Sequence, residues 1–539
     1  MAAIMFTLVA WGGFATDSLA AVTARALEWL IVNLGWFFVL SATGFVAFAL
    51  YLAFSRFGRI PLGRDDEEPE FRTVSWIAMM FSAGMGIGLM FFGVSEPLSH
   101  FVSPPPGTVP LAADGTVAAG AEAQAIRTAM ATTLFHWTLH PWAIYAVAGL
   151  AIAYSAFRKG RSQLISSVFA PLLGSRAHGP AGKLIDILAL FATLFGSAAS
   201  LGIGTLQIRT GLIEAGWIEG AGAGVLVLII VALTICFIAS AVSGVAKGIQ
   251  YLSNINMVLA VLLAVFVFVV GPTVFMLNLV PTSIGSYLSD FGLMASRSGA
   301  TGGAAMSAWL QSWTVFYWAW WISWTPFVGM FIARISRGRT IRQFIGGVLL
   351  VPSVISVLWF SIFGGAAIGL ARAGAPVVEG GAEAQTFNVL AELPLTGITS
   401  AIVIVLVAIF FVSGADAASV VMGTLSQRGS LSPSRWVVVF WGAATGAVAA
   451  IMLAIGGNAA LTGIQNLTFI AALPFTVVMV AMCYALMKDL LRDPIVLREN
   501  KATELLDAAV AQGIEEHDGE FQLEISQAGG TSAGSRTLR

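Results

Sequence analysis

Long apolar runs separated by short polar stretches dominate the sequence. The runs without any charged residue cover 29–55, 73–95, 128–157, 187–208, 220–246, 248–289, 298–333, 343–371, 393–415 and 436–487. About 20 apolar residues cross the hydrocarbon core of a bilayer as a helix, so each run predicts at least one membrane span. The pattern therefore predicts an all-α integral membrane protein.

Three runs decide how many spans there are. The run 436–487 is too long for one helix and contains a Gly-Gly-Asn break, so it predicts two spans. The stretch 1–16 is short, but no basic residue precedes Arg25, which argues against a signal peptide and favours a first membrane helix whose start is clipped. The run 248–289 is also too long, and its tail is expected along the interface or in an outer loop. The total is twelve transmembrane helices.

The distribution of basic residues gives the orientation. Of the 27 Lys and Arg residues, 22 lie in the C-terminal tail and in the loops after spans 2, 4, 6, 8 and 10, and five lie in the opposite loops. Cytoplasmic loops carry such an excess. The sequence predicts a multi-pass protein of the cell (inner) membrane with both termini cytoplasmic.

Composition excludes several other classes of protein. Only 10% of the 539 residues are charged, against roughly a quarter in soluble domains. Cys236 and Cys483 both lie in apolar runs and predict no disulfide framework or cysteine metal site. The net charge of −1 gives no reason to expect nucleic acid. In the tail 488–539, six basic residues face ten acidic ones; Lys488 to Val510 has the spacing of a modest amphipathic helix, and the rest is expected to be disordered.

The run 73–95 contains three glycines at alternate positions, Gly84, Gly86 and Gly88. Glycines in membrane helices usually serve close helix packing, but alternate positions lie on different faces of a helix. An unwound stretch that exposes backbone groups at the bilayer midplane fits better, and transporters use such breaks to bind substrates and ions.

Aromatic residues are concentrated in the run 298–333, where six of the 16 tryptophans fall within 16 residues. An interfacial belt is the usual alternative, but Trp320, Trp321 and Trp324 lie near the centre of the run. Pro326 is expected to loosen the helix nearby. Five aromatic residues recur every three or four positions and share one face: Trp313, Tyr317, Trp320, Trp324 and Phe327.

A second aromatic group, Trp137, Trp142 and Tyr145, falls within an arc of about 140° on one helix. Alone it needs no explanation beyond core packing. Together the two groups suggest an aromatic box. A fully alkylated onium group has no N–H to donate, and aromatic faces attract it by roughly 0.5–2 kcal/mol per ring. The expected ligand is a small quaternary ammonium or sulfonium compound.

Other polar residues carry weaker signals. His136 and His140, spaced i, i+4, could bind a metal, but no third ligand lies in the same run, so this hypothesis is weak. Glu96, Asp186 and Asp416 each lie at a span end. Intramembrane acids are functional candidates by default, although structural hydrogen bonding explains these three equally well.

Five segments resemble the betaine/choline/carnitine transporter family, over nearly the whole chain except the tail. They are Gly84–Gly88, Phe92–Pro97, Phe135–Tyr145, Tyr317–Trp324 and Arg334–Arg339. The resemblance implies a LeuT-type core of two inverted five-helix repeats, and a homotrimer. The implied domains are 1–72 (peripheral helices 1 and 2 with a cytoplasmic loop), 73–289 (first repeat, helices 3–7), 290–487 (second repeat, helices 8–12) and 488–539 (cytoplasmic tail). Helix 3 and helix 8, the latter at Pro326, would be interrupted in equivalent positions.

The resemblance also implies site residues. For the substrate these are Trp137, Trp142, Tyr145 and Trp321, continued by Trp320 and Trp324, with the glycine stretch Gly84, Met85, Gly86 and Gly88 beside the substrate carboxylate and backbone. For sodium they are Ser82, Met85, Phe410, Ser413 and Gly414 at one site, and Thr193, Ser197 and Phe327 at a second.

Three positions bear on the coupling ion. Proton-linked choline carriers of the family have Asp where this chain has Gly88, and sodium-independent carnitine exchangers have Arg where it has Met257. Both favour the sodium-coupled betaine branch. Against this, Gly414 lacks the hydroxyl that often follows the position of Ser413. We expect a secondary carrier of glycine betaine with sodium as coupling ion and no cofactor; choline, carnitine or dimethylsulfoniopropionate are other candidate substrates. Three alternatives remain: a cation-independent exchanger, a membrane enzyme and a sensor. The sequence shows no catalytic cluster that would favour the enzyme and no signalling domain that would favour the sensor.

Overall fold

The computed structural model describes residues 2–84, 86–219, 222–243, 246–430, 432–456, 460–517 and 520–522. Within these residues the regular structure is helical, and the β-pairings are two isolated bridges, Pro61 with Thr340 and Leu111 with Val117. The chain divides into two compact units, Met1–Leu486 and Met487–Arg539.

The first half of the chain forms α1 (Ala2–Phe14), α2 (Thr16–Phe54), α3 (Thr73–Gly84), α4 (Ile87–Val102), α5 (Glu122–Trp137), α6 (Leu139–Ala153), α8 (Pro180–Glu214), α9 (Ala223–Ser243), α10 (Ala246–Val270) and α11 (Thr273–Ala295). The second half forms α12 (Gly299–Leu310), α13 (Phe316–Ile335), α14 (Ile341–Arg372), α15 (Ala382–Ala391), α16 (Thr396–Ser426), α17 (Arg435–Gly456), α18 (Ala460–Leu490) and α19 (Pro494–His517). Short turns are η1 (Arg56–Arg59), η2 (Tyr154–Arg158), η3 (Ile165–Phe169), α7 (Ala170–Leu173), η4 (Gly174–His178) and η5 (Gln311–Val315).

Every apolar run contains at least one described helix, but fewer of these helices than the twelve predicted spans are long enough to cross a membrane unaided. Within the described residues seven are long and apolar enough, or eight when one bent pair counts as a span. The count is lower than twelve because α1 has only 13 residues and because α3 and α4 are separate short helices. Over the described residues, the regular structure is helical as predicted, and it contains seven to eight candidate spans.

The run that seemed too long for one helix is bent. Residues Asn254–Val270 of α10 and Thr273–Ala295 of α11 meet at 110°. The break falls at Gly271 and Pro272, because proline has no N–H to continue the helix. The run therefore forms two helices instead of one, and the location of the second helix at the interface or in an outer loop stays a prediction.

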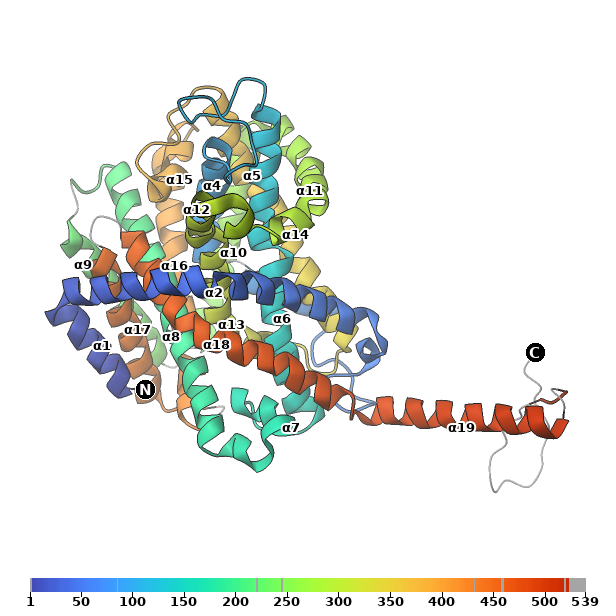
Figure 1. Ribbon diagram of the computed structural model, residues 1–539. Helices are drawn as coiled ribbons and strands as arrows, with labels where there is room; N and C mark the ends of the chain where they lie inside the picture. The colour runs from blue at the N-terminus through green and yellow to red at the C-terminus, as the bar shows by residue number, and fades with distance from the viewer. Residues whose placement is uncertain are drawn as a thin grey trace. The chain divides into compact units, whose positions relative to one another are not determined.

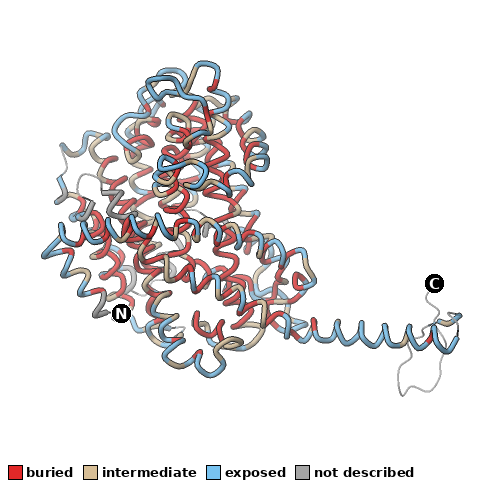
Figure 2. Tube along the Cα trace, in the orientation of Figure 1, coloured by how far each residue is buried: buried red, intermediate tan, exposed pale blue. Residues whose placement is uncertain are grey.

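Helices from both halves of the chain pack together around the centre of the first unit, where buried residues concentrate (Figures 1 and 2). α6 and α13 approach closely because glycines face each other: a Cβ at Gly149 would lie 3.3 Å from the carbonyl oxygen of Gly329. Small residues allow such close approach of membrane helices. α4, α8 and α14 pack against the same region, so five helices surround one central volume.

The segment between α2 and α3 is bound to the segment between α13 and α14. The backbone amide of Leu62 donates to the carbonyl of Arg339 (2.8 Å), and that of Gly338 donates to Leu62 (2.9 Å). Gly338 has φ +80°, a conformation that favours glycine. The guanidinium of Arg339 stacks on the ring of Trp76, 4.1 Å from its centroid, and donates to the carbonyl of Phe71. Burial lowers the pKa of Arg339.

The second unit contains α19. Its helix extends from Pro494 to His517, beginning later and ending later than the predicted Lys488 to Val510, because Pro494 suits the first turn of a helix. Nearly all its residues are exposed, with Val496 and Gly513 as the buried ones.

Candidate functional site

The alternate glycines coincide with a break between α3 and α4. α3 ends at Gly84 and α4 begins at Ile87, and Gly86 between them is fully extended, with φ −170° and ψ −179°. As the residue that precedes α4, Gly86 accepts from the backbone amide of Met90 at 3.4 Å, whereas the first amides of a helix have no partner within the helix. Met85 lies outside the described residues, as does the side chain of Ser82. The expected interruption of this run is present in the residues on either side.

A second break, which the sequence analysis missed, separates α5 from α6 at Thr138 (φ −114°, ψ −111°). Pro141 supplies the reason: it cannot donate to the carbonyl of Trp137, four residues earlier. That carbonyl instead accepts a hydrogen bond from the Ser356 hydroxyl of α14, at 2.9 Å. Trp137 is therefore the last residue of α5, and Trp142 lies in the first turn of α6. Pro141 was the available signal for this break.

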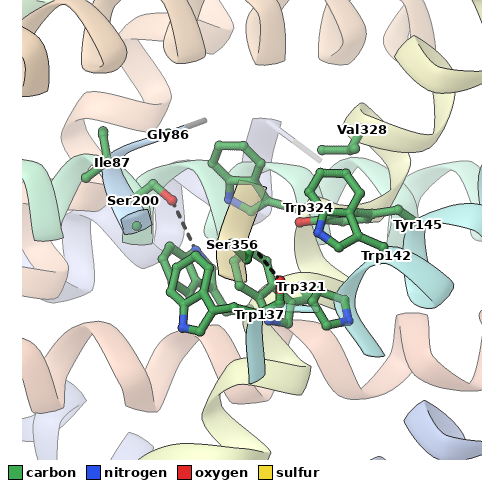
Figure 3. A pocket seen from close by; sticks show the side chains of 13 residues that line it. Gly86, Ile87, Trp137, Trp142, Tyr145, Ser200, Trp321, Trp324, Val328 and Ser356 are labelled. Atoms are coloured by element: carbon green, nitrogen blue, oxygen red, sulfur yellow. Dashed lines mark hydrogen bonds between the residues drawn. The ribbon is translucent and has the colours of Figure 1, made fainter. Parts of the chain in front are cut away.

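One cavity brings the two aromatic groups together (Figure 3). Its walls come from α4, α6, α8, α13 and α14, with Trp137 at the end of α5. The lining residues are Gly86, Ile87, Gly88, Trp137, Pro141, Trp142, Tyr145, Ser200, Trp320, Trp321, Trp324, Val328 and Ser356. All six predicted aromatic residues and the described glycines 86 and 88 therefore line the same volume.

The rings of the cavity are held at fixed angles. Trp137 and Trp321 lie edge to face with centroids 4.9 Å apart, and Trp320 stacks on Trp321 at 4.9 Å and 14°. The indole N–H groups donate to protein oxygens: Trp137 to Glu96 (2.6 Å), Trp320 to Ser200 (3.1 Å), Trp321 to the His136 carbonyl (3.1 Å) and Trp324 to the Gly196 carbonyl (2.8 Å). Because the polar edges of these rings are bonded to protein, the aromatic faces are what the walls can offer a ligand.

The aromatic face predicted for the run 298–333 is only partly correct. Trp320 and Trp324 line the cavity, but Trp313 packs instead against His100, with ring centroids 4.5 Å apart. The expected interruption at Pro326 is wrong, since α13 continues from Phe316 to Ile335. The helix can continue through Pro326 because neighbouring groups can satisfy the carbonyl that a proline leaves free in a membrane helix. The irregularity of this run lies earlier, in the π-helical turn η5.

A polar cluster missed by the sequence analysis lies behind Trp137. The Glu96 side chain is fully buried. Its Oε2 accepts from the Trp137 N–H (2.6 Å) and the Tyr317 hydroxyl (2.5 Å), and its Oε1 lies 2.6 Å from Nδ1 of His136. These partners are 41, 221 and 40 residues away in sequence, so spacing along the chain could not have revealed them.

Glu96, His100 and His136 could together hold a metal ion, since one ligand atom from each lies within 4.8 Å of the others. The 2.6 Å separation of Glu96 and His136 is a hydrogen-bond distance. His140, the other half of the weakly predicted histidine pair, is directed elsewhere: its ring stacks on Trp318 at 4.9 Å. The described residues therefore favour a hydrogen-bonded cluster over a metal centre.

The residues of the second predicted sodium site lie where α8 packs against α13. Thr193 and Ser197 are buried, and Thr193 Oγ1 donates to the carbonyl of Ala189 at 2.9 Å. Gly196, which lies between Thr193 and Ser197 in sequence, accepts a hydrogen bond through its carbonyl from the indole N–H of Trp324. The ring of Trp324 lies 5.6 Å from that of Phe327. α8 and α13 are therefore in contact beside the three residues of this predicted site.

At the first predicted sodium site, three of the five residues are described in full, all on α16. The Ser413 hydroxyl donates to the carbonyls of Ile409 (2.8 Å) and Phe410 (3.4 Å). Among the described residues, no atom lies within 4 Å of a Cβ added to Gly414. None of their side chains therefore replaces the missing hydroxyl beside Gly414.

The two remaining acids differ in their surroundings. Asp186 accepts from both the backbone amide (2.9 Å) and the hydroxyl (2.8 Å) of Ser166, which is a structural role. Asp416, on α16 close to Ser413, is 7% exposed.

Known transporters resemble this chain over most of its length. The family model described as BCCT, betaine/carnitine/choline family transporter, matches residues 1–495. The betaine/ectoine transporter LcoP of Corynebacterium glutamicum is 46% identical over 98% of this chain and 82% of its own. The glycine betaine transporter OpuD of Bacillus subtilis is 46% identical over 94% of this chain and 95% of its own.

Among solved structures, a Na⁺-coupled sialic acid symporter in a substrate-bound outward-open state matches 85% of this chain and 86% of its own, at a TM-score of 0.43 and 13% identity. Such a likeness supports no conclusion about this site. The family match spans nearly the whole chain, and the two transporters match it at 46% identity. The chain therefore belongs to the betaine/carnitine/choline family of transporters and is a multi-pass membrane transporter rather than an enzyme.

Proposed function

We propose that this protein imports a small onium zwitterion, glycine betaine in the first place, by sodium-coupled alternating access. The observation that carries the proposal is the cavity of Trp137, Trp142, Tyr145 and Trp321. Several aromatic faces surround one volume, and the indole N–H groups described above donate to protein oxygens. This geometry suits a trimethylammonium head, which aromatic faces attract and which no hydrogen-bond acceptor can hold.

The glycine break beside the rings suits the carboxylate of the same ligand. Gly86 is extended, Gly88 lies in the first turn of α4, and both line the cavity, so the N-terminus of a helix lies at its wall. Helix N-termini attract anions. A zwitterion would thus lie with its cation among the rings and its anion at the break. The names of LcoP and OpuD support betaine, and ectoine is a second candidate from the name of LcoP.

For the architecture we propose two inverted five-helix repeats, 73–289 and 290–487, flanked by the peripheral segment 1–72 and the cytoplasmic tail 488–539. The broken helices α3–α4 and the irregular η5–α13 begin the two repeats, which supports equivalence between them. The distribution of basic residues supports cytoplasmic termini. We further propose a homotrimer, on the family resemblance alone.

Sodium is the proposed coupling ion because a betaine carries no net charge at neutral pH. The membrane potential alone cannot concentrate it. Each co-transported cation contributes about 2.3 kcal/mol per 100 mV, and a thousandfold gradient requires about 4.1 kcal/mol. One or two sodium ions suffice, and Thr193, Ser197 and Phe327, in the region where α8 contacts α13, are the proposed residues of the stronger site.

The test is uptake of labelled glycine betaine into proteoliposomes of purified protein. We expect electrogenic uptake that requires an inward sodium gradient and is abolished when choline-free potassium buffer replaces sodium. Competition by choline, carnitine, dimethylsulfoniopropionate and ectoine would rank the substrates. Uptake that persists unchanged in potassium buffer would indicate exchange or proton coupling, and absence of binding by every onium compound would reject the proposed substrate class.

A further inference from the structure

Glu96 lies directly behind one wall of the aromatic cavity. Trp137 spans the distance between the carboxylate and the cavity: its N–H donates to Oε2 of Glu96, while the far edge of its ring lies 2.7 Å from the position of a Cβ on Gly88. The same carboxylate oxygen accepts from Tyr317. One buried carboxyl group is therefore bonded to a lining ring and to the phenol beside it.

The charges around Glu96 are few. Among the described residues, its ion-pair partners within 4 Å are His136 on α5 (2.6 Å) and His100 on its own helix (3.5 Å). On the far side, Nε2 of His136 bonds to Thr314 of η5 at 2.9 Å. Arg297 is engaged elsewhere, with Thr132 at 3.2 Å and over the ring of Trp309. No described arginine or lysine therefore neutralises this carboxylate by direct pairing.

Three hydrogen-bonding groups converge on Glu96. Trp137 and Tyr317 donate to Oε2, and the tautomer of His136 with its hydrogen on Nδ1 donates to Oε1. Burial of Glu96 opposes the charged form and hydrogen bonds to the carboxylate favour it, so this set of three donors is the feature that suits an ionised Glu96. A carboxylate that accepts a hydrogen bond from the N–H of an indole increases the electron density of that ring. The field of the carboxylate also adds to the attraction of the ring for a cation.

We propose that Glu96 supplies the negative charge that makes the aromatic cavity selective for cationic heads, acting through Trp137 as a positioning residue. The inference rests on the proposed function and deepens it. Glu96 has no contact with the ligand; it holds Trp137 and Tyr317 in place and makes the face of Trp137 more attractive to an onium group than an unassisted ring.

The experiment compares two ligands of the same shape. Glycine betaine and 3,3-dimethylbutanoate share a carboxylate, and the quaternary nitrogen of the first is a neutral carbon in the second. The ratio of their dissociation constants, measured by titration calorimetry on purified wild-type protein, isolates the contribution of the positive charge. A role of Glu96 that is only structural would weaken both ligands equally and leave the ratio unchanged.

Glu96→Gln is the central variant. Its carbonyl oxygen can accept from Trp137 and Tyr317, and its amide can donate to the other tautomer of His136, so the shape is kept and the charge removed. We expect the preference for betaine over the isostere to fall about tenfold, the scale of a unit charge acting over roughly 10 Å at an effective dielectric constant near 20. Tyr317→Phe is the matched control, because it removes one hydrogen bond from the same oxygen and keeps the charge; the ratio should stay at the wild-type value.

Glu96→Asp covers the case in which the glutamine variant does not fold. It keeps the charge on a shorter side chain, so both ligands should weaken while their ratio persists. An unchanged ratio in Glu96→Gln, or a lost ratio in Glu96→Asp, would overturn the inference. Equal binding of both ligands by the wild type would overturn it without any variant. Failure of the wild type to bind betaine would instead reject the proposed function.

Discussion

Gly88 touches the aromatic wall with its backbone: an added Cβ would lie 2.7 Å from Cη2 of Trp137 and 2.8 Å from Cη2 of Trp320. Real Cβ contacts are longer, so glycine at this position is what lets both rings close over the start of α4. The absence of an acidic side chain here was the sequence argument against proton coupling. The geometry adds a steric reason why this cavity requires glycine.

Gly88→Ala should therefore weaken betaine binding. Overpacking of this kind costs about 1–3 kcal/mol, and we expect a dissociation constant about tenfold higher, measured by calorimetry. Gly44→Ala is the control, since that helical glycine is exposed, lies on α2 and has no atom within 4 Å of an added Cβ. Wild-type affinity in Gly88→Ala would contradict the close packing of the two rings.

Trp321→Ala should abolish measurable uptake of betaine. The ring contributes roughly 0.5–2 kcal/mol as a cation–π partner, and its loss also removes the surfaces that hold Trp137 and Trp320 at 4.9 Å. Expression and oligomer size should persist. Trp436→Ala, at a side chain that is 79% exposed on α17, should transport normally. Near-normal affinity in Trp321→Ala would refute the role of this ring.

Thr193→Ala should reduce the sodium dependence of uptake. The hydroxyl bonds the carbonyl of Ala189, an arrangement that costs the helix little when it is lost, so the effect should appear in the sodium concentration for half-maximal uptake. Thr205→Ala is the matched control, because Thr205 is also buried on α8 and bonds the carbonyl four residues earlier at 2.8 Å. Equal sodium curves for the two variants would remove Thr193 from the proposed site.

Gly414→Ser should strengthen the first sodium site. The part of the chain that the structure describes leaves room for a side chain at this position, and one added oxygen ligand of ordinary strength is worth about 1 kcal/mol. We expect half-maximal uptake at a sodium concentration about fivefold lower. Gly397→Ser, on the same helix and equally open, should leave the curve unchanged. No difference between the two would argue that no ion is bound at Ser413.

Deletion of residues 512–539 should leave the response of uptake to osmolality unchanged. Basic segments bind anionic lipid by about 1 kcal/mol per basic residue, whereas the segment 488–539 has six basic and ten acidic residues. Uptake into proteoliposomes with anionic lipid, measured across a series of external osmolalities, tests this. A lost response in the truncated protein would show that the tail senses osmolality despite its net negative charge.

The sequence predicted those parts of the site that depend on local pattern. Alternate glycines predicted the break before Ile87. Trp137, Trp142 and Tyr145 line one cavity as predicted, but the single helix on which the spacing argument placed them is wrong, because α5 ends at Trp137 and α6 carries the other two. Contacts between distant segments could not be predicted, since nothing in the neighbourhood of Glu96 specifies Tyr317. Proline misled in both directions: Pro141 marks a break that was missed, and Pro326 lies in a helix that continues. A single proline removes one hydrogen bond, and the surrounding helices decide whether the chain bends there.

The stacking of Arg339 on Trp76 joins α3 to the end of α13. Trp76 lies on α3, on one side of the glycine break, and Arg339 follows α13, which carries Trp320, Trp321 and Trp324 to the cavity. A movement of α3 relative to α13 would have to take the end of α13 along or break this stack, a contact of about 0.5–2 kcal/mol. The stack thus links the helix that precedes the glycine break to the helix that carries three tryptophans of the cavity.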